Sequence, residues 1–249
     1  MVALMRALWA EMLKMKRTVA LRLAFLAPAA VMAYAVLFSA SEQSGQHDMW
    51  IAYWRMGRIF WALLMLPLFV TLQSSLLAGI EHRNGQWKQL FAQPIPRWAI
   101  YMAKQMGVAL MMGLSFVALI GFMALGGLLL RAVGLEWAAG AAIPWGELLL
   151  PLGAAYLASW LLMAIHTWVG LRTKSFALAS AVGIVMMVAG VVIISSKWGS
   201  YYPWALPGVI VNEFSKGMSL WRPELLFGCL GGIVVALLGC RDVIRRDVL

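Results

Sequence analysis

Long apolar runs alternate with short polar segments along the whole 249-residue chain. A helix that crosses the hydrocarbon core of a bilayer needs about 20 mainly apolar residues. Runs of this kind occur at about residues 19–40, 59–80, 104–130, 148–171, 176–196 and 224–240. The longest connections that contain polar residues are about 41–58, 81–103 and 197–223. The pattern predicts an all-α integral membrane protein with six transmembrane helices.

Residues 1–18 precede the first run and have a helical periodicity of their own. At 100° per residue, one face of this helix carries apolar side chains, those of Leu4, Met5, Leu8, Trp9, Met12 and Met15. Most of the charged side chains lie opposite, including Arg6, Glu11 and Lys14. We expect an amphipathic helix at residues 1–18 in the membrane interface, followed by a single transmembrane domain at residues 19–249. The alternative is a plain lead into the first span.

Composition supports a membrane protein and argues against a nucleic-acid-binding one. The chain is 63% hydrophobic and 12% charged, whereas soluble domains are about 45–50% apolar and about 25% charged. The net charge of +10 comes from basic residues that are scattered between apolar runs. No continuous basic face of a soluble module is present, so we expect no nucleic-acid partner. Membrane lipids are the expected surroundings.

The distribution of Lys and Arg predicts the orientation. Cytoplasmic loops of membrane proteins carry the excess of these residues. Most of the 20 Lys and Arg residues fall in the two ends and the connections after the second and fourth runs. The other set of connections holds only Arg55, Arg58, Arg131, Lys197, Lys216 and Arg222. We therefore expect a multi-pass protein of the bacterial cytoplasmic (inner) membrane with both termini in the cytoplasm.

The sequence does not indicate an enzyme or a metal site. The three histidines, His47, His82 and His166, are expected outside, inside and within a span, so they cannot converge on one metal. No P-loop, H-E-x-x-H or G-x-S-x-G motif is present. No Asp or Glu lies in the middle of an apolar run. Ion-coupled transporters usually place ionisable groups there, so we expect the energy for any transport to come from another protein.

A few polar side chains lie inside the spans and can have either of two roles. They are Gln73, Ser74 and Ser75 in the second run and His166 and Thr167 in the fourth. They can hydrogen bond between helices, which is the more common role of such residues. They can also line a substrate path.

The most informative polar segment follows the second run. Trp87, Leu90 and Phe91 stand at helix positions i, i+3 and i+4, so they share one face of a short helix. Asn84-Gly85 can start this helix, and Pro94 stops it. A short helix with an aromatic face and basic flanks can lie on the membrane or dock in a groove of a partner. Periodicity alone does not choose between these.

The wider pattern E-x-x-x-G-x-W-x-x-L-x-x-x-P-x-x-R, followed by a lysine, resembles the first cytoplasmic loop of ABC-2 type transporter permeases. The matching positions are Glu81, Gly85, Trp87, Leu90, Pro94, Arg97 and Lys104. The stretch 11–17 is similar to the E-x-x-K-x-K-R lead of the same family. Within the family, the likeness is greatest to the lantibiotic-immunity and bacteriocin-protection permeases, through the segment 202–207.

This resemblance implies a non-catalytic subunit of an ATP-driven exporter. The partners would be two copies of a separate ABC ATPase, which carries ATP and Mg²⁺, and a second permease chain, identical or a paralogue. This chain would bind no cofactor or metal itself. The substrate would be amphipathic: a peptide or lantibiotic, a drug or a lipid. The alternative is a non-transporting membrane scaffold or sensor subunit.

The resemblance also assigns roles to residues. The ATPase would dock on the loop 81–98, as a coupling helix, through Glu81, Asn84, Gly85, Trp87, Lys88, Leu90, Phe91, Pro94, Arg97 and Lys104. Glu81, Arg97 and Lys104 would fix this loop by charge, or act only as ordinary interfacial anchors.

The connection 197–223 is rich in Trp and Tyr, including Tyr202 and Trp204. The resemblance implies short re-entrant helices here, above the translocation path. The aromatic side chains can contact an amphipathic substrate, or they can form an ordinary interfacial belt.

In the last run, Gly228, Gly232, Ala236 and Cys240 recur every four residues. Such a stripe of small residues allows helices to approach closely, and we expect it to pack within the subunit.

Overall fold

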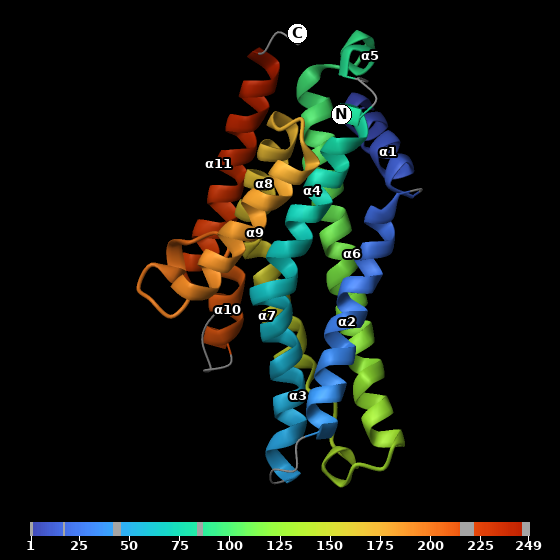
Figure 1. Ribbon diagram of the computed structural model, residues 1–249, viewed down its shortest axis with the longest axis vertical. Coiled ribbons are helices and arrows are strands. Elements are labelled where there is room, and N and C mark those ends of the chain that lie inside the picture. Colours follow the sequence, from blue (N-terminus) through green and yellow to red (C-terminus); the bar gives the residue numbers. More distant parts are fainter. Residues whose placement is uncertain (1, 17, 42–45, 84–86, 215–221, 246–249) are drawn as a thin grey trace.

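The computed structural model describes residues 2–16, 18–41, 46–83, 87–214 and 222–245 (Figure 1). All regular elements in these residues are helical. Six helices are long and apolar enough to cross a membrane: Val19–Ser41, Met49–His82, Arg97–Ala132, Trp145–Arg172, Phe176–Ile193 and Pro223–Arg245. The predicted all-α fold with six spans is confirmed.

The described residues form eleven α-helices and short pieces of other helix types. The α-helices are α1 (Val2–Lys16), α2 (Val19–Ser41), α3 (Gln46–Phe60), α4 (Leu66–Arg83), α5 (Trp87–Ala92), α6 (Arg97–Ala132), α7 (Trp145–Ala158), α8 (Trp160–Arg172), α9 (Phe176–Ile193), α10 (Leu206–Phe214) and α11 (Pro223–Arg245). A π-helical turn, η1 (Trp61–Met65), joins α3 to α4, and η2 (Glu136–Ala138) and η3 (Gly199–Tyr201) are 3₁₀ turns. Both ends of the chain lie at one end of the bundle, together with α1 and α5 (Figure 1). Which side of a membrane this end faces stays a prediction.

The second span begins ten residues earlier than the sequence predicts. Residues 46–60 form α3 instead of an outer connection. Their charged residues lower the hydropathy, but the aromatic face of α3 is buried, with Trp50 6% exposed and Tyr53 and Trp54 fully buried. The phenol of Tyr53 donates a hydrogen bond to the carbonyl of Met123 in α6, at 2.7 Å. Packing against α6 therefore stabilises a helix that hydropathy alone did not identify.

Glycines in α6 make this packing possible. A Cβ atom at Gly127 would lie 3.0 Å from the ring of Trp54, and one at Gly126 would collide with the Tyr53 hydroxyl. Both glycines lie in the last two turns of α6, at the end of the bundle away from the termini (Figure 1).

The last span packs closely on the fourth one through its small residues. A Cβ atom at Gly228 would lie 2.6 Å from the backbone of Ala158, and one at Gly232 would lie 2.7 Å from the carbonyl carbon of Trp160. Both glycines of the predicted stripe therefore contact the junction of α7 and α8 in the same chain. Ala236, one turn further on, faces a pocket instead.

The N-terminal helix differs from its predicted pattern. Helix α1 packs on α6 through Ala7, Leu8 and Met15, but Glu11 is also buried, at 3% exposed, rather than on a polar face. Trp9, predicted on the apolar face in the membrane interface, is 69% exposed. The prediction for Glu11 was wrong: at 100° per residue, Glu11 lies within about 40° of both Leu4 and Met15, so it borders the apolar face rather than lying opposite it. The position of α1 in a membrane interface stays a prediction.

Candidate functional site

Four charged side chains from three helices meet at the end of the bundle that carries the termini. Lys14 lies 2.8 Å from Glu11 within α1 and 2.9 Å from Glu81 near the end of α4. Lys104, two turns into α6, lies 2.8 Å from Glu81 and 3.2 Å from Glu11. We call these residues the charged cluster. Each carboxylate contacts both ammonium groups, so the four charges compensate one another.

The charged cluster is unusually well buried. Lys104 is fully buried, and Glu81 and Glu11 are 1% and 3% exposed. Burial by itself lowers the pKa of Lys14, but the carboxylates of Glu11 and Glu81 raise it above the ordinary value, so Lys14 stays charged at neutral pH. Buried charges are tolerated when they are paired and hydrogen bonded, and removing one partner leaves an uncompensated charge that is strongly destabilising. The cluster therefore locks α1, α4 and α6 together.

The charged cluster connects the two ends of the loop that contains α5. Glu81 lies just before the loop, and Lys104 lies after it in α6, so their contact ties the α4 and α6 sides together. Arg97, the third predicted charge, lies elsewhere: its Nη1 donates to the carbonyl of Ile244 at the end of α11, at 3.4 Å. The sequence indicated Glu81 and Lys104 but not their partners Glu11 and Lys14. The i, i+3 spacing of Glu11 and Lys14 was the only local signal of that pair.

The predicted docking helix is present as α5, which ends before Pro94 as expected. Leu90 is half-buried, and its neighbour Gln89 is exposed. Asn84 and Gly85 lie outside the described residues. The backbones of Trp87, Lys88 and Phe91 belong to α5, but their side chains lie outside the described part of the structure. Helix α5 projects at the end of the bundle, beyond α4 and α6 (Figure 1).

His166 joins three parts of the chain inside the bundle. The indole N–H of Trp204 donates to Nε2 of His166 at 3.0 Å, and Thr71 Oγ1 lies 3.3 Å from the same nitrogen. Trp204 precedes α10, and Thr71 belongs to α4. On α9, the residue next to the His166 ring is Gly183. A Cβ atom at this position would lie only 2.7 Å from the ring, so the absence of a side chain allows α9 to pack close to His166. His166 thus attaches the connection before α10 to the spans.

The remaining polar residues of the spans are also packed inside the chain. Gln73 donates to the carbonyl of Ala20 in α2 at 2.6 Å, and Ser74 donates to Val70 within its own helix at 2.8 Å. Ser75 and Thr167 are 3% and 2% exposed. Tyr202 donates to the carbonyl of Met186 in α9 at 2.9 Å. Gln73 and Tyr202 thus bond to other helices, Ser74 bonds within its own helix, and burial of these side chains favours a structural over a lining role in a single chain.

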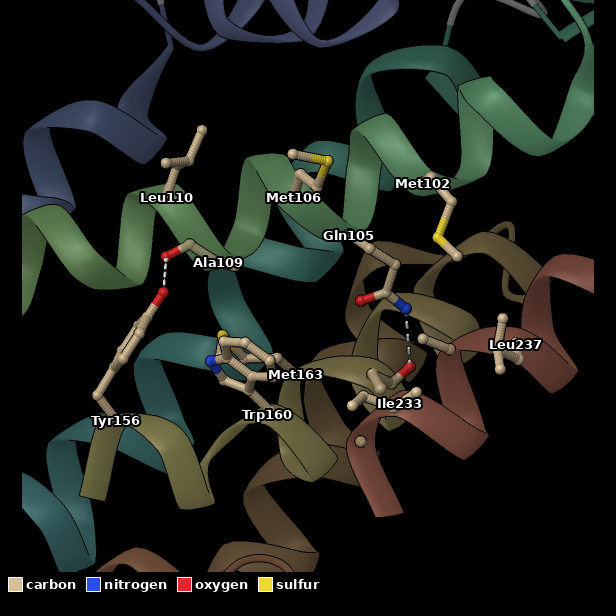
Figure 2. Close-up of a pocket in the computed structure, with 13 residues that line it drawn as sticks. Met102, Gln105, Met106, Ala109, Leu110, Tyr156, Trp160, Met163, Ile233 and Leu237 are labelled. Atoms are coloured by element: carbon tan, nitrogen blue, oxygen red, sulfur yellow. Dashed lines mark hydrogen bonds between the residues drawn. The ribbon is translucent and has the colours of Figure 1, made fainter. Parts of the chain in front are cut away.

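A lateral pocket of about 380 Å³ lies between α6, α8 and α11 (Figure 2). Its lining is mainly apolar and rich in methionine, with Met102 and Met106 from α6 and Met163 from α8. Two polar side chains on its wall are already engaged: Tyr156 donates to the carbonyl of Ala109, and Gln105 donates to that of Ala164. Flexible methionine side chains adapt to apolar ligands of varied shape, so this pocket suits an apolar group in the membrane plane.

Among the described residues, no group of three or more His, Cys, Asp or Glu side chains could hold a metal ion. The candidate site therefore consists of the short projecting helix α5, the charged cluster at the same end of the bundle (Figure 1) and the hydrogen bonds of His166 in the interior.

Comparison with known proteins provides an independent result. Residues 7–190 match a family model described as "ABC-2 family transporter protein". The matched region includes α1 from Ala7, the charged cluster, α5 and the first five spans almost to the end of α9. No curated protein sequence is significantly similar to the chain.

Proposed function

The chain belongs to the ABC-2 family of transporter proteins and so forms a membrane permease of an ABC transporter, and we propose that it is the subunit through which an ATP-driven exporter moves an amphipathic substrate. The energy would come from a separate ABC ATPase that docks on the loop 81–98. The permease itself would supply the path and the mechanical link, without catalysis.

The charged cluster is the observation that carries this proposal. A force applied to α5 reaches two spans at once, because Glu81 in α4 and Lys104 in α6 are in direct contact on either side of the loop. Through Glu11 and Lys14, α1 moves with them. Packed helices that are locked in this way move as rigid bodies, which is how closure of an ATPase pair can shift transmembrane helices.

The substrate class follows from the surfaces available to it. The lateral pocket offers an apolar, methionine-rich wall, and the exposed aromatic side chains of Trp198 and Tyr201 lie on the connection between the last two spans. An amphipathic molecule that moves within or along the membrane suits both. A peptide of the lantibiotic or bacteriocin type is the substrate that the subfamily resemblance favours, with drugs and lipids as the other members of the class.

The assembly would contain two ATPase copies and a second permease chain, identical to this one or a paralogue. It would lie in the bacterial cytoplasmic membrane with both termini on the ATPase side. The common position of the termini, α1 and α5 at one end of the bundle supports this orientation (Figure 1).

The docking loop can be tested in the complete complex. The permease and its ATPase are co-purified, reconstituted in liposomes and measured for ATP hydrolysis and substrate transport. Replacing Trp87 and Leu90 together by Ala should release the ATPase or uncouple hydrolysis from transport. Gln89→Ala is the matched control, because Gln89 is exposed on the same helix but outside the proposed docking face. Transport by the permease alone without ATP, or full coupling in the double variant, would refute the proposal.

The same experiment addresses a scaffold or sensor role. A complex that assembles normally, binds the ATPase through α5 and shows no substrate-dependent hydrolysis with any amphipathic probe would favour the non-transporting alternative.

A further inference from the structure

Arg58 is a buried cation whose hydrogen-bonding capacity is only partly used. It lies on α3, within the second span, and is 3% exposed. Its Nη2 is 3.9 Å from Glu147 Oε2, which is a long ion pair, and the side chain of Glu147 is 59% exposed. The Nε of Arg58 is buried and has no hydrogen-bond partner among the described residues. An unsatisfied buried donor on a charged group is costly unless a ligand completes it.

This guanidinium lines a cavity of about 470 Å³. The walls come from three elements: Ile51 and Arg55 with Arg58 on α3, Glu147 and Leu150 on α7, and Phe214 at the end of α10. Ile51, Arg55 and Arg58 follow one another at i, i+4 and i+7, so they share one face of α3. The volume lies in the range of sites that bind small molecules, about 300–1,000 Å³.

The chemistry of the lining is that of an amphipathic anion site. Among the residues that line the cavity, two arginines, Arg55 and Arg58, stand against a single carboxylate, Glu147, which leaves a net positive charge. Ile51 and Leu150 on the same walls are 47% and 53% exposed and offer apolar surface. Glu147 lies in the first turn of α7, so the cavity is at the level where the fourth span begins. Headgroups of lipids lie at this level of a membrane, and arginine guanidinium groups form strong, often bidentate hydrogen bonds with phosphate.

We propose that this cavity binds an anionic phospholipid, with its phosphate on the guanidinium groups of Arg55 and Arg58 and its acyl part against Ile51 and Leu150. The bound phosphate completes the hydrogen bonding of Arg58 Nε. The proposal is independent of the transport function, because it concerns the end of the bundle opposite to α5.

Binding is measured by native mass spectrometry on the purified full-length chain, which is delipidated and titrated with phosphatidylglycerol or phosphatidylcholine of the same acyl chains. We expect phosphatidylglycerol to bind about tenfold more tightly. Arg55→Gln should weaken its binding about five- to tenfold, as expected for the loss of one cation near the phosphate. Glu147→Gln should strengthen it, because it removes the carboxylate that repels the phosphate. Both side chains are exposed, so these variants should fold even if Arg58→Gln does not.

Lys197→Gln is the matched control, since it removes one positive charge from an exposed side chain away from the cavity and should leave binding unchanged. Equal affinity for the two lipids would overturn the proposal. So would weaker binding in Glu147→Gln, which would mean that Glu147 contacts the ammonium group of a zwitterionic lipid. Displacement of phosphatidylglycerol by millimolar inorganic phosphate would also overturn it, in favour of a site for a free anion.

Discussion

The indole of Trp204 donates a hydrogen bond to the imidazole of His166 across 3.0 Å in the interior of the bundle. Trp204 lies on the connection between the fifth and sixth spans, and His166 lies in the fourth. This bond therefore fixes the segment just before α10 to the membrane-spanning core. His166, one of the polar residues expected inside the spans, is therefore engaged within the chain.

Trp204→Phe should test the strength of this tie. The ring is kept but the N–H is lost, so Nε2 of His166 loses a buried donor, at a cost of about 1–3 kcal/mol. We expect a lower unfolding temperature in detergent, followed by tryptophan fluorescence or light scattering. Trp198→Phe is the control, because Trp198 is 64% exposed. An unchanged unfolding temperature in Trp204→Phe would show that Thr71, at 3.3 Å, replaces the lost donor.

Lys104→Met should destabilise the charged cluster. It leaves two buried carboxylates with one ammonium group, and breaking a buried pair in this way costs about 3–5 kcal/mol. Adding Glu81→Gln restores charge balance and should recover part of the loss, so the two effects are not additive. Thermal unfolding of the purified chain measures both. Lys174→Met, at an exposed position, should have little effect. Additive losses in the double variant would contradict direct coupling of Glu81 and Lys104.

The pH dependence of the cluster has a definite sign. The pKa of Lys14 is raised above its ordinary value of 10.5 because Glu11 and Glu81 outweigh the effect of burial. A raised pKa contributes stability that is complete below about pH 10.5 and disappears as the pH rises through the higher value of the folded state. The difference in unfolding temperature between wild type and Lys14→Met should thus be constant from neutral pH to about 10 and shrink above it. A difference that already shrinks between pH 7 and 9 would contradict the pairing.

Gly232→Ala should weaken the contact between α11 and the fourth span. The new Cβ would lie 2.7 Å from the backbone of Trp160, and backbone atoms cannot move aside as a side-chain end can. We expect a loss of about 1–3 kcal/mol from overpacking. Gly121→Ala in α6 is the matched helical control, since no atom lies within 4 Å of its Cβ position. Equal unfolding temperatures for the two variants would mean that α11 is not held by this contact.

Local features of the fold could be predicted from particular stretches of sequence. Each span satisfies its backbone hydrogen bonds within itself, so its length and apolar character suffice to identify it. Pro94 ended the helix before it for the same local reason, because proline cannot continue the backbone pattern. The family resemblance through Glu81, Gly85 and Trp87 pointed to the family that the match over residues 7–190 shows.

The partners of the charged side chains were decided by tertiary structure. Glu11 and Lys104 are 93 positions apart in the chain, and their contact depends on how α1 packs on α6. The periodicity of side chains within either helix does not show which helix it packs against. For the same reason, α3 had too many polar residues to be identified by hydropathy, and Arg58 was expected in a loop.

What the sequence alone determined was therefore the number and apolar character of the membrane spans, because each span is stable in lipid through its own backbone hydrogen bonds and apolar side chains. What only the folded chain decided was which charges are buried: Glu11, Glu81 and Lys104 at one end, where they pair with each other and with the partly exposed Lys14, and Arg58 at the other. The physical reason is that burying a charge depends on a partner, and the partner lies on a different helix.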